Sequence, residues 1–327
     1  MTVNNPRLAI VIPCYKEEEV LPITSKQFLS QLNSMIEEGL IAEDSKVVFV
    51  NDGSTDRTWE IIENLSKKES HYEGISLSRN RGHQNALLGG LMTVKDDFDI
   101  TISIDCDGQD DISVMTEMVK KYHEGAEIVY GVRSSRETDT GFKRWTAQTY
   151  YKVLAKLGTE VVYNHADYRL MSTKALNSFA DFKEVNLYLR GLVPMIGYKT
   201  DKVTYSRKER EAGESHYPLK KMLQLAIDGI TSTSIEPIRL VTTGGVLITF
   251  ISAIMILATI ISKLCGNTVS GWASLMCVIL FMGGVQMVSL GIIGEYVGKA
   301  YMETKHRPRY IISRNTMKEQ VDSLGED

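Results

Sequence analysis

Short apolar runs alternate with stretches of helical periodicity over most of the N-terminal part of the chain. The apolar runs predict strands at Leu8–Pro13, Lys46–Val50, Ile75–Leu77, Ile100–Asp105, Ile128–Gly131 and Lys202–Tyr205. Helical spacing predicts helices at Glu18–Leu32, Thr55–Lys67 with Ser54 as N-cap, Gln84–Val94, Ser113–Tyr122 and Lys143–Leu157. This alternation is typical of an α/β domain with a mainly parallel sheet, which we place at residues 1–215.

Two uncharged stretches follow, Leu240–Ser262 and Gly271–Gly294. Each exceeds the ~20 residues that a helix needs to cross a bilayer. Helices of this length in soluble proteins rarely lack a charged face. We therefore predict a transmembrane hairpin at 239–296, with helices at about 240–262 and 271–294.

The distribution of basic residues predicts the topology of this hairpin. Its connecting loop, Lys263–Ser270, holds one basic residue, and Arg239 precedes the first helix. The C-terminal flank carries Lys299, Lys305, Arg307, Arg309 and Arg314. The positive-inside rule then places the N-terminal domain and the basic tail at 297–327 in the cytoplasm.

The segment just before the first span has apolar residues at helical spacing within Pro218–Ile235. Lys220 and Lys221 lead it, which suits a helix that lies in the membrane surface. An ordinary amphipathic helix packed on the domain fits the same pattern. We assign residues 216–238 to amphipathic juxtamembrane helices.

Composition narrows the class of protein. Of 327 residues, 43% are hydrophobic and 24% charged, which predicts an ordered chain. The 41 acidic residues outnumber the 37 basic ones, and no nucleic-acid motif is present, so nucleic acid is not an expected partner. Four isolated cysteines without CxxC spacing indicate reduced thiols, and the short polar N-terminus is not expected to be a signal peptide.

Three predicted strands end in chemically loaded sequences. They are Pro13-Cys14-Tyr15-Lys16-Glu17-Glu18, Asn51-Asp52-Gly53-Ser54-Thr55-Asp56 and Ser103-Ile104-Asp105-Cys106-Asp107-Gly108-Gln109-Asp110-Asp111. Ligands of open α/β sheets bind at the carboxyl ends of the strands. The four carboxylates of the third sequence fit either a solvated acidic turn or a site for a hard cation. Each of these sequences alone is weak evidence for a ligand site. Their occurrence in this order on successive strands is much more specific evidence.

With these motifs the chain resembles the family-2 glycosyltransferases of GT-A fold, through VIPCYKEEE, VNDGSTD and DCDGQDD. The sequences HADYRLMS, EREAGESHYPLKKM and YMETKHRPRYII, with the two apolar spans, narrow the likeness. They resemble polyprenyl-phosphate glycosyltransferases, which include the bactoprenol glucosyltransferases and, as a relative, dolichol-phosphate mannose synthase. The likeness covers nearly the whole chain.

The resemblance implies that Asp107 and Gln109 approach a divalent metal, with Asp105 near the ribose or the metal. Oxygen ligands suit Mg²⁺ or Mn²⁺. A calcium EF-hand is excluded, because the sixth and twelfth positions from Asp105 are Asp110 and Thr116 instead of Gly and Glu.

The donor would be a UDP-sugar. The resemblance assigns its nucleotide part to Pro13, Tyr15, Glu17 and Asp52, with Arg207 also on the donor side. The segment Arg79–Asn85 opens a helix and fits either an anion site or plain helix capping.

The acceptor would be polyprenyl (undecaprenyl) phosphate, whose second pKa of ~6 leaves it largely a dianion at neutral pH. The resemblance places Arg133 and Arg144 at its phosphate, although Gln148 stands where dolichol-type relatives have Ser. Arg207 or Arg210, with Ser215 and Tyr217, is expected to close over the substrates. Asp167 occupies the position of the family's catalytic base. Because the acceptor is already ionised, we expect Asp167 to orient the acceptor or the sugar instead of removing a proton. We keep Asp167 as a catalytic residue, together with Asp107, Arg207 and Arg210.

The predicted reaction is a single inverting displacement that gives a β-linked lipid phosphate sugar for cell-envelope polysaccharide or O-antigen modification. The sugar stays open between glucose, N-acetylglucosamine and N-acetylgalactosamine. The resemblance implies the bacterial inner (plasma) membrane and a homo-oligomer, a tetramer in relatives. Gly244-Gly245 and Gly283-Gly284 permit close helix packing, within the hairpin or between chains.

Two other readings are weighed. A processive polysaccharide synthase would carry Gln-x-x-Arg-Trp, but Gly141 precedes Arg144-Trp145 and two spans are too few for a polymer channel. A non-catalytic scaffold or lipid-sugar transporter would leave the acidic strand ends unexplained. Its spans offer only Gln286 as a notable polar group.

Overall fold

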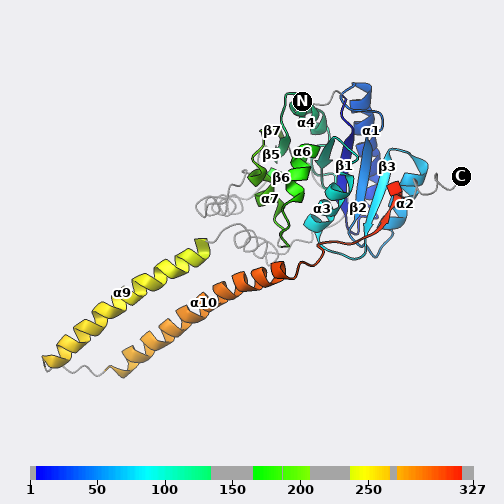
Figure 1. Ribbon diagram of the computed structural model, residues 1–327. Coiled ribbons are helices and arrows are strands. Elements are labelled where there is room, and N and C mark those ends of the chain that lie inside the picture. The colour runs from blue at the N-terminus through cyan, green and yellow to red at the C-terminus, as the bar shows by residue number, and fades with distance from the viewer. Residues whose placement is uncertain (1–4, 134–164, 186, 207–235, 266–270, 319–327) are drawn as a thin grey trace.

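The computed structural model describes residues 5–133, 165–185, 187–206, 236–265 and 271–318. Its centre is an eight-stranded sheet of order β7-β5-β6-β4-β1-β2-β3-β8 (Figure 1). The strands are β1 Leu8–Cys14, β2 Lys46–Asn51, β3 Tyr72–Leu77, β4 Ile100–Ser103, β5 Ile128–Arg133, β6 His165–Ser172, β7 Thr200–Tyr205 and β8 Ile312–Asn315. Strands β1 to β4 pair in parallel, as do β5 and β7, whereas β6 and β8 are antiparallel to their neighbours.

Helices cover both faces of the sheet, which explains why the central strands are apolar on both sides. All seven residues of β1 are buried. The helices of the domain are α1 Leu21–Glu37, α2 Thr58–Lys68, α3 His83–Val94, α4 Val114–His123, α6 Thr173–Ala180 and α7 Leu189–Leu192, followed by the 3₁₀ helix η1 Val193–Ile196.

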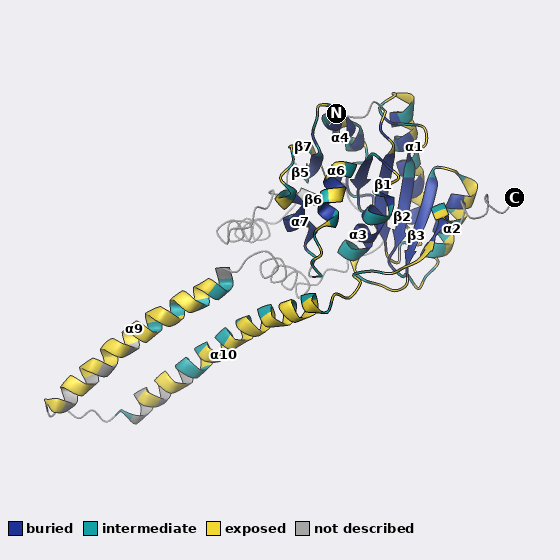
Figure 2. Cartoon of the chain, viewed as in Figure 1, coloured by how far each residue is buried: buried dark blue, intermediate teal, exposed yellow. Residues whose placement is uncertain are grey.

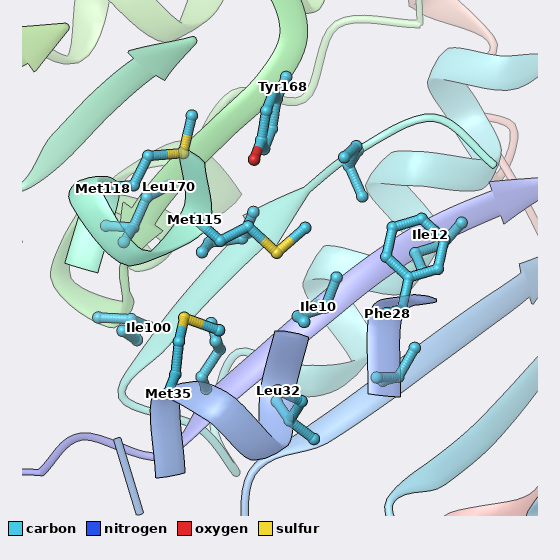
Figure 3. Close-up of a cluster of buried hydrophobic side chains, with 14 of the residues drawn as sticks. Ile10, Ile12, Phe28, Leu32, Met35, Ile100, Met115, Met118, Tyr168 and Leu170 are labelled. Carbon is cyan, nitrogen blue, oxygen red and sulfur yellow. The ribbon is translucent and has the colours of Figure 1, made fainter. Parts of the chain in front are cut away.

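Two hydrophobic clusters form the core, one on each face of the sheet. Phe28, Leu32 and Met35 of α1 meet Met115 and Met118 of α4 beneath the sheet residues of the first cluster (Figure 3). Residues of α3, α6 and α7 form the second cluster on the opposite face. This packing fixes the carboxyl ends of β1, β2 and β4 beside one another, because β1 pairs with both of the other strands.

The predicted α/β fold with a mainly parallel sheet is confirmed, and six strands and four helices lie close to their predicted positions. Strands β6 and β8 were not predicted. The prediction of Ser54 as an N-cap is wrong, because α2 begins at Thr58 and the Ser54 hydroxyl accepts a hydrogen bond from the Lys16 backbone at 3.1 Å. The predicted helices at Lys143–Leu157 and Pro218–Ile235 lie outside the described residues.

A helical hairpin extends from the domain. It consists of α9 Glu236–Leu264 and α10 Trp272–Thr304, which contact each other. Figure 2 shows that most described residues of both helices are exposed or half-buried. The exposed residues include large apolar ones such as Phe250, Leu257 and Phe281. Within the described residues, one segment, Pro237–Met255, is long and apolar enough to cross a membrane, with a mean hydropathy of 1.8. The second predicted span, at about 271–294, stays a prediction.

The chain returns to the domain after α10. Strand β8 pairs with β3 at the sheet edge, so part of the predicted basic tail completes the sheet. The Glu303 carboxylate accepts a hydrogen bond from the Val185 backbone at 2.8 Å, and Arg309 donates to the Phe182 carbonyl at 3.0 Å. These contacts join the base of the hairpin to the segment between α6 and α7.

Candidate active site

Asp52, just after β2, binds the loop that precedes α3. Asp52 is buried, and its two carboxylate oxygens accept hydrogen bonds from the backbone of Arg81 at 2.7 Å and of Gly82 at 2.9 Å. Burial raises the pKa of Asp52, although both backbone donors act in the opposite direction. Gly53 has φ +61°, and a Cβ there would lie 2.4 Å from the Arg79 carbonyl carbon. The predicted base-reading residue therefore also positions the start of α3.

The predicted nucleotide residues of β1 lie beside this loop. The Asp52 backbone donates to the Cys14 carbonyl at 2.9 Å, which places the sequence after β1 against the end of β2. The Tyr15 side chain is 43% exposed, and the Glu17 backbone donates to the Thr58 hydroxyl at 3.0 Å. Pro13 is buried within β1. An exposed aromatic face at a strand end is suited to a nucleoside.

The acidic sequence after β4 divides into carboxylates with different surroundings. Gly108 makes the turn at φ +70°, and the Gln109 backbone donates to Asp107 at 3.1 Å. Asp110 points inward and accepts hydrogen bonds from Tyr205 at 2.8 Å and Arg133 at 3.2 Å. Asp110 therefore supports the protein interior, and the predicted ligand role of Asp105 and Asp107 stays a prediction.

Arg133, a predicted ligand of the acceptor phosphate, pairs with Asp110 in the structure. Its side chain is 25% exposed and forms an ion pair with buried Asp110. Burial alone lowers the pKa of Arg133, but Asp110 outweighs it and raises the pKa, so the guanidinium stays charged. Five other predicted site residues lie outside the described residues: Arg144, Arg207, Arg210, Ser215 and Tyr217.

Asp167 lies opposite the acidic sequence because of the antiparallel strand β6. Ser103 pairs with Arg169, and the Ser103 hydroxyl donates to the Asp167 carbonyl at 2.6 Å, which brings Asp167 to the end of β4. The Asp167 side chain is 9% exposed and accepts from Arg169 at 2.6 Å and from Arg190 at 3.3 Å. Burial alone raises the pKa of Asp167, but the surrounding cations outweigh it and hold the pKa well below its ordinary value. Asp167 is therefore an ionised anchor for cationic side chains.

His83, the first residue of α3, connects Asp167 with the acidic sequence. Its Nε2 lies 3.4 Å from Asp105 Oδ1 and 3.6 Å from Asp167 Oδ2. Burial lowers the pKa of His83, but Asp105 and Asp167 outweigh it and raise the pKa to about 9. The imidazole is thus a cation at neutral pH, shared by two carboxylates on neighbouring strands.

The raised pKa of His83 predicts a pH dependence of stability. Its ordinary pKa is 6.5, so its contribution is complete below pH 6.5 and is lost as the pH rises toward about 9. We expect the melting temperature, measured in metal-free buffer, to fall across this window in the wild type. His83→Gln should flatten that part of the curve. An unchanged slope in the variant would contradict the assignment of this titration to His83.

The loop after β4 offers oxygen atoms that suit a divalent cation. Asp105 Oδ1 is buried and makes no hydrogen bond, although the His83 imidazole faces it at 3.4 Å, and Asp107 and Gln109 add oxygen atoms in the same loop. Carboxylate and amide oxygens suit Mg²⁺ or Mn²⁺. Among the described residues, no group of three or more His, Cys, Asp and Glu side chains forms a metal site. The oxygen atoms of Asp105, Asp107 and Gln109 would suit a divalent cation whose remaining ligands come from the substrate.

The sequence reasoning singled out Asp167 but missed its partners. His83 belongs to the segment Arg79–Asn85, which was interpreted only as an anion site or a helix cap. Arg169 lies two residues after Asp167 and is fully buried, which an unpaired charge does not tolerate. Arg190 carries no local signal, since its contact with Asp167 is tertiary.

The chain belongs to Glycosyl transferase family 2, whose family model matches residues 9–179. A second model, the GtrB C-terminal hairpin, matches residues 236–300 and therefore α9 and most of α10. The N-terminal domain is thus that of a glycosyltransferase, and the helical hairpin matches a described C-terminal domain, the GtrB hairpin.

Relatives match the chain almost from end to end. A glycosyltransferase of Bacillus subtilis named YkoT, described as uncharacterized, is 51% identical over 99% of this chain and 96% of its own. The prophage bactoprenol glucosyl transferase homolog of Escherichia coli is 39% identical over 94% and 99%, respectively. The bactoprenol glucosyl transferase of Shigella phage SfV is 38% identical over 95% and 100%.

Proposed function

We propose that this protein transfers a hexose from a UDP-sugar to polyprenyl phosphate. The sugar would be glucose or an N-acetylhexosamine, and the lipid-linked product would serve cell-envelope polysaccharide or O-antigen modification. The observation that carries this proposal is the near full-length similarity, hairpin included, to relatives named bactoprenol glucosyl transferase at 38% and 39% identity. Polyprenyl phosphate is insoluble in water, and an apolar hairpin joined to the catalytic domain suits its delivery from a membrane.

The acceptor needs little activation by a base. A phosphate monoester with a pKa of ~6 is already a nucleophile at neutral pH. Asp167 has a pKa held well below its ordinary value, so it is a poor proton acceptor at that pH. Its contribution is to hold His83, Arg169 and Arg190 at the strand ends. Inverting displacement at the anomeric carbon would then be accelerated by positioning and charge.

Asp107 and Gln109, with Asp105 beside them, would hold Mg²⁺ or Mn²⁺. When bound, the cation would neutralise charge on the departing nucleoside diphosphate. Pro13, Tyr15, Glu17 and Asp52 would hold the nucleotide. The proposed role of Arg207 at the donor and of Arg144, Arg210, Ser215 and Tyr217 at the acceptor rests on the family motifs alone.

The proposed location is the bacterial plasma membrane, with both termini and the catalytic domain in the cytoplasm. The apolar segment Pro237–Met255 supports membrane attachment. The second span, the juxtamembrane helices at 216–238 and a homo-oligomer such as a tetramer belong to the same proposal.

Transfer can be tested with the detergent-purified full chain, undecaprenyl phosphate and a panel of radiolabelled UDP-sugars, with Mg²⁺, Mn²⁺ or EDTA. We expect label from one donor to enter the organic phase with either metal and to be lost with EDTA. Undecaprenol, which lacks the phosphate, is the matched acceptor control and should take up no label.

Other outcomes would overturn the proposal. Label in high-molecular-mass polymer would indicate a processive synthase. Binding of UDP without transfer to the lipid from any donor would indicate a non-catalytic protein or another acceptor.

A further inference from the structure

Two of the cationic side chains around Asp167 are open to solvent. Arg169 is 2% exposed at its side chain, whereas Arg190 is 34% and His83 36% exposed. Buried Arg169 approaches Asp167 Oδ1 at 2.6 Å, so Arg190 is a second, more exposed cationic partner of the same carboxylate. Arg190 therefore adds positive charge at a solvent-facing position beside Asp167.

The backbone of Leu189, the residue before Arg190, is held by two hydrogen bonds. The Leu189 N–H donates to the Gln84 side chain at 3.0 Å, and the Leu189 carbonyl accepts from Arg169 at 3.4 Å. Gln84 is the neighbour of His83 on α3. These two bonds hold α7 against α3 and β6, so the guanidinium of Arg190 is positioned before any substrate arrives.

The chain just before α7 is attached to the base of the hairpin. Both Glu303 oxygens lie 2.8 Å from the Val185 N–H, and Arg309 donates to the Phe182 carbonyl at 3.0 Å. Arg190 follows Val185 by only a few residues. The cation therefore lies on the element that joins the strand-end site to the hairpin, where the headgroup of a lipid would enter.

We propose that Arg190 is a ligand of the acceptor phosphate. This inference rests on the proposed function and deepens it by assigning the acceptor to a residue that the family motifs did not indicate. The planar guanidinium holds Asp167 through Nε and Nη2 and donates to the phosphate oxygens from its solvent-exposed part, as suits recognition of phosphate by arginine. The pairing with Asp167 orients Arg190, and the solvent-exposed face of the site receives the phosphate.

The test compares Arg190→Gln and Arg190→Lys with the wild-type full chain in detergent, using undecaprenyl phosphate and the UDP-sugar that the wild type accepts. We expect Arg190→Gln to raise the KM for the lipid phosphate roughly tenfold to a hundredfold, the range for loss of a charged hydrogen bond. UDP affinity should change less than about threefold. Arg190→Lys should recover part of the KM, because it retains the charge without the fork.

Arg7→Gln is the matched control, since Arg7 also pairs with a carboxylate, Asp99, but lies before β1 at the opposite end of the strand. It should leave both constants unchanged. An unchanged KM for the lipid in Arg190→Gln, or equal losses for UDP and lipid in both Arg190 variants, would overturn the inference.

Direct binding separates this inference from the proposed function. Undecaprenyl phosphate and undecaprenol are added to each protein in detergent, and binding is followed by tryptophan fluorescence. Preference for the phosphate that is lost in Arg190→Gln supports the inference even if the wild type transfers no sugar. If the wild type shows no preference for the phosphate, both the inference and the proposed acceptor are overturned. If the wild type transfers sugar and Arg190→Gln binds the phosphate equally well, the inference alone is overturned.

Discussion

Sugar transfer is expected to fall roughly a thousandfold in Asp107→Ala. If Asp107 is the metal ligand proposed above, its loss removes several kcal/mol of charge stabilisation, and about 4 kcal/mol corresponds to three decades in rate. Asp107 lies at the end of β4, where Asp105 Oδ1 is buried without a hydrogen bond and Gln109 offers a further oxygen. The measurement is kcat/KM for the transfer reaction over a range of Mn²⁺ concentrations. UDP binding by the variant in Mn²⁺ should fall to the level of the wild type in EDTA.

Asp111→Ala provides the control for this prediction within the same acidic loop. The Asp111 carboxylate accepts from the Ser113 backbone at 3.2 Å and from its hydroxyl at 2.8 Å, just before α4. Its loss should cost about 1 kcal/mol of stability, as for a lost helix cap, and leave the metal dependence intact. Equal loss of metal dependence in both variants would indicate that the loop acts through its total charge, and Asp107 would not be a specific ligand.

The strand ends could be predicted from the sequence because both signals involved are local. Apolar runs mark β1, β2 and β4, and polar residues follow each run directly. Parallel pairing then requires these ends to meet at one edge of the sheet. The structure brings Tyr15, Asp52 and Asp105 to that edge, and their roles toward a nucleotide stay predictions.

Strands β6 and β8 could not be predicted in the same way. Asp167 and Arg169 interrupt the apolar pattern of β6, and they are tolerated in a buried strand because they pair with each other. Strand β8 is short, and three of its four residues are exposed. Its position depends on pairing with β3, far away in the chain. Both misses therefore reflect tertiary contacts that outweigh local pattern.

The two cations beside Asp167, His83 and Arg190, were missed for a related reason. His83, Asp105, Asp167 and Arg190 lie on different elements, α3, the loop after β4, β6 and α7. No spacing in the sequence links them. The strongest sequence signal was a charged pair inside one strand, Asp167 and Arg169, which gains meaning only once β6 is placed between β4 and β5.

That buried pair carries the other large expected effect. Asp167→Ala should lower the free energy of unfolding by about 3–5 kcal/mol, because Arg169 would keep its charge in the interior without its carboxylate partner. Transfer activity should fall by roughly a hundredfold or more even where the variant stays folded, since His83 and Arg190 lose the group that orients them. Chemical denaturation and transfer assays at ambient temperature measure both effects.

A double variant separates the two contributions of Asp167. Asp167→Leu combined with Arg169→Met replaces the buried pair by apolar side chains of similar size, which is often neutral for stability. We expect the double variant to regain most of the stability that Asp167→Ala loses and to remain inactive. Recovery of activity together with stability would show that Asp167 acts only through the fold. Stability without activity would assign it to the alignment of the cations that face the substrates, because the interior would then be intact while His83 and Arg190 lack their anchor.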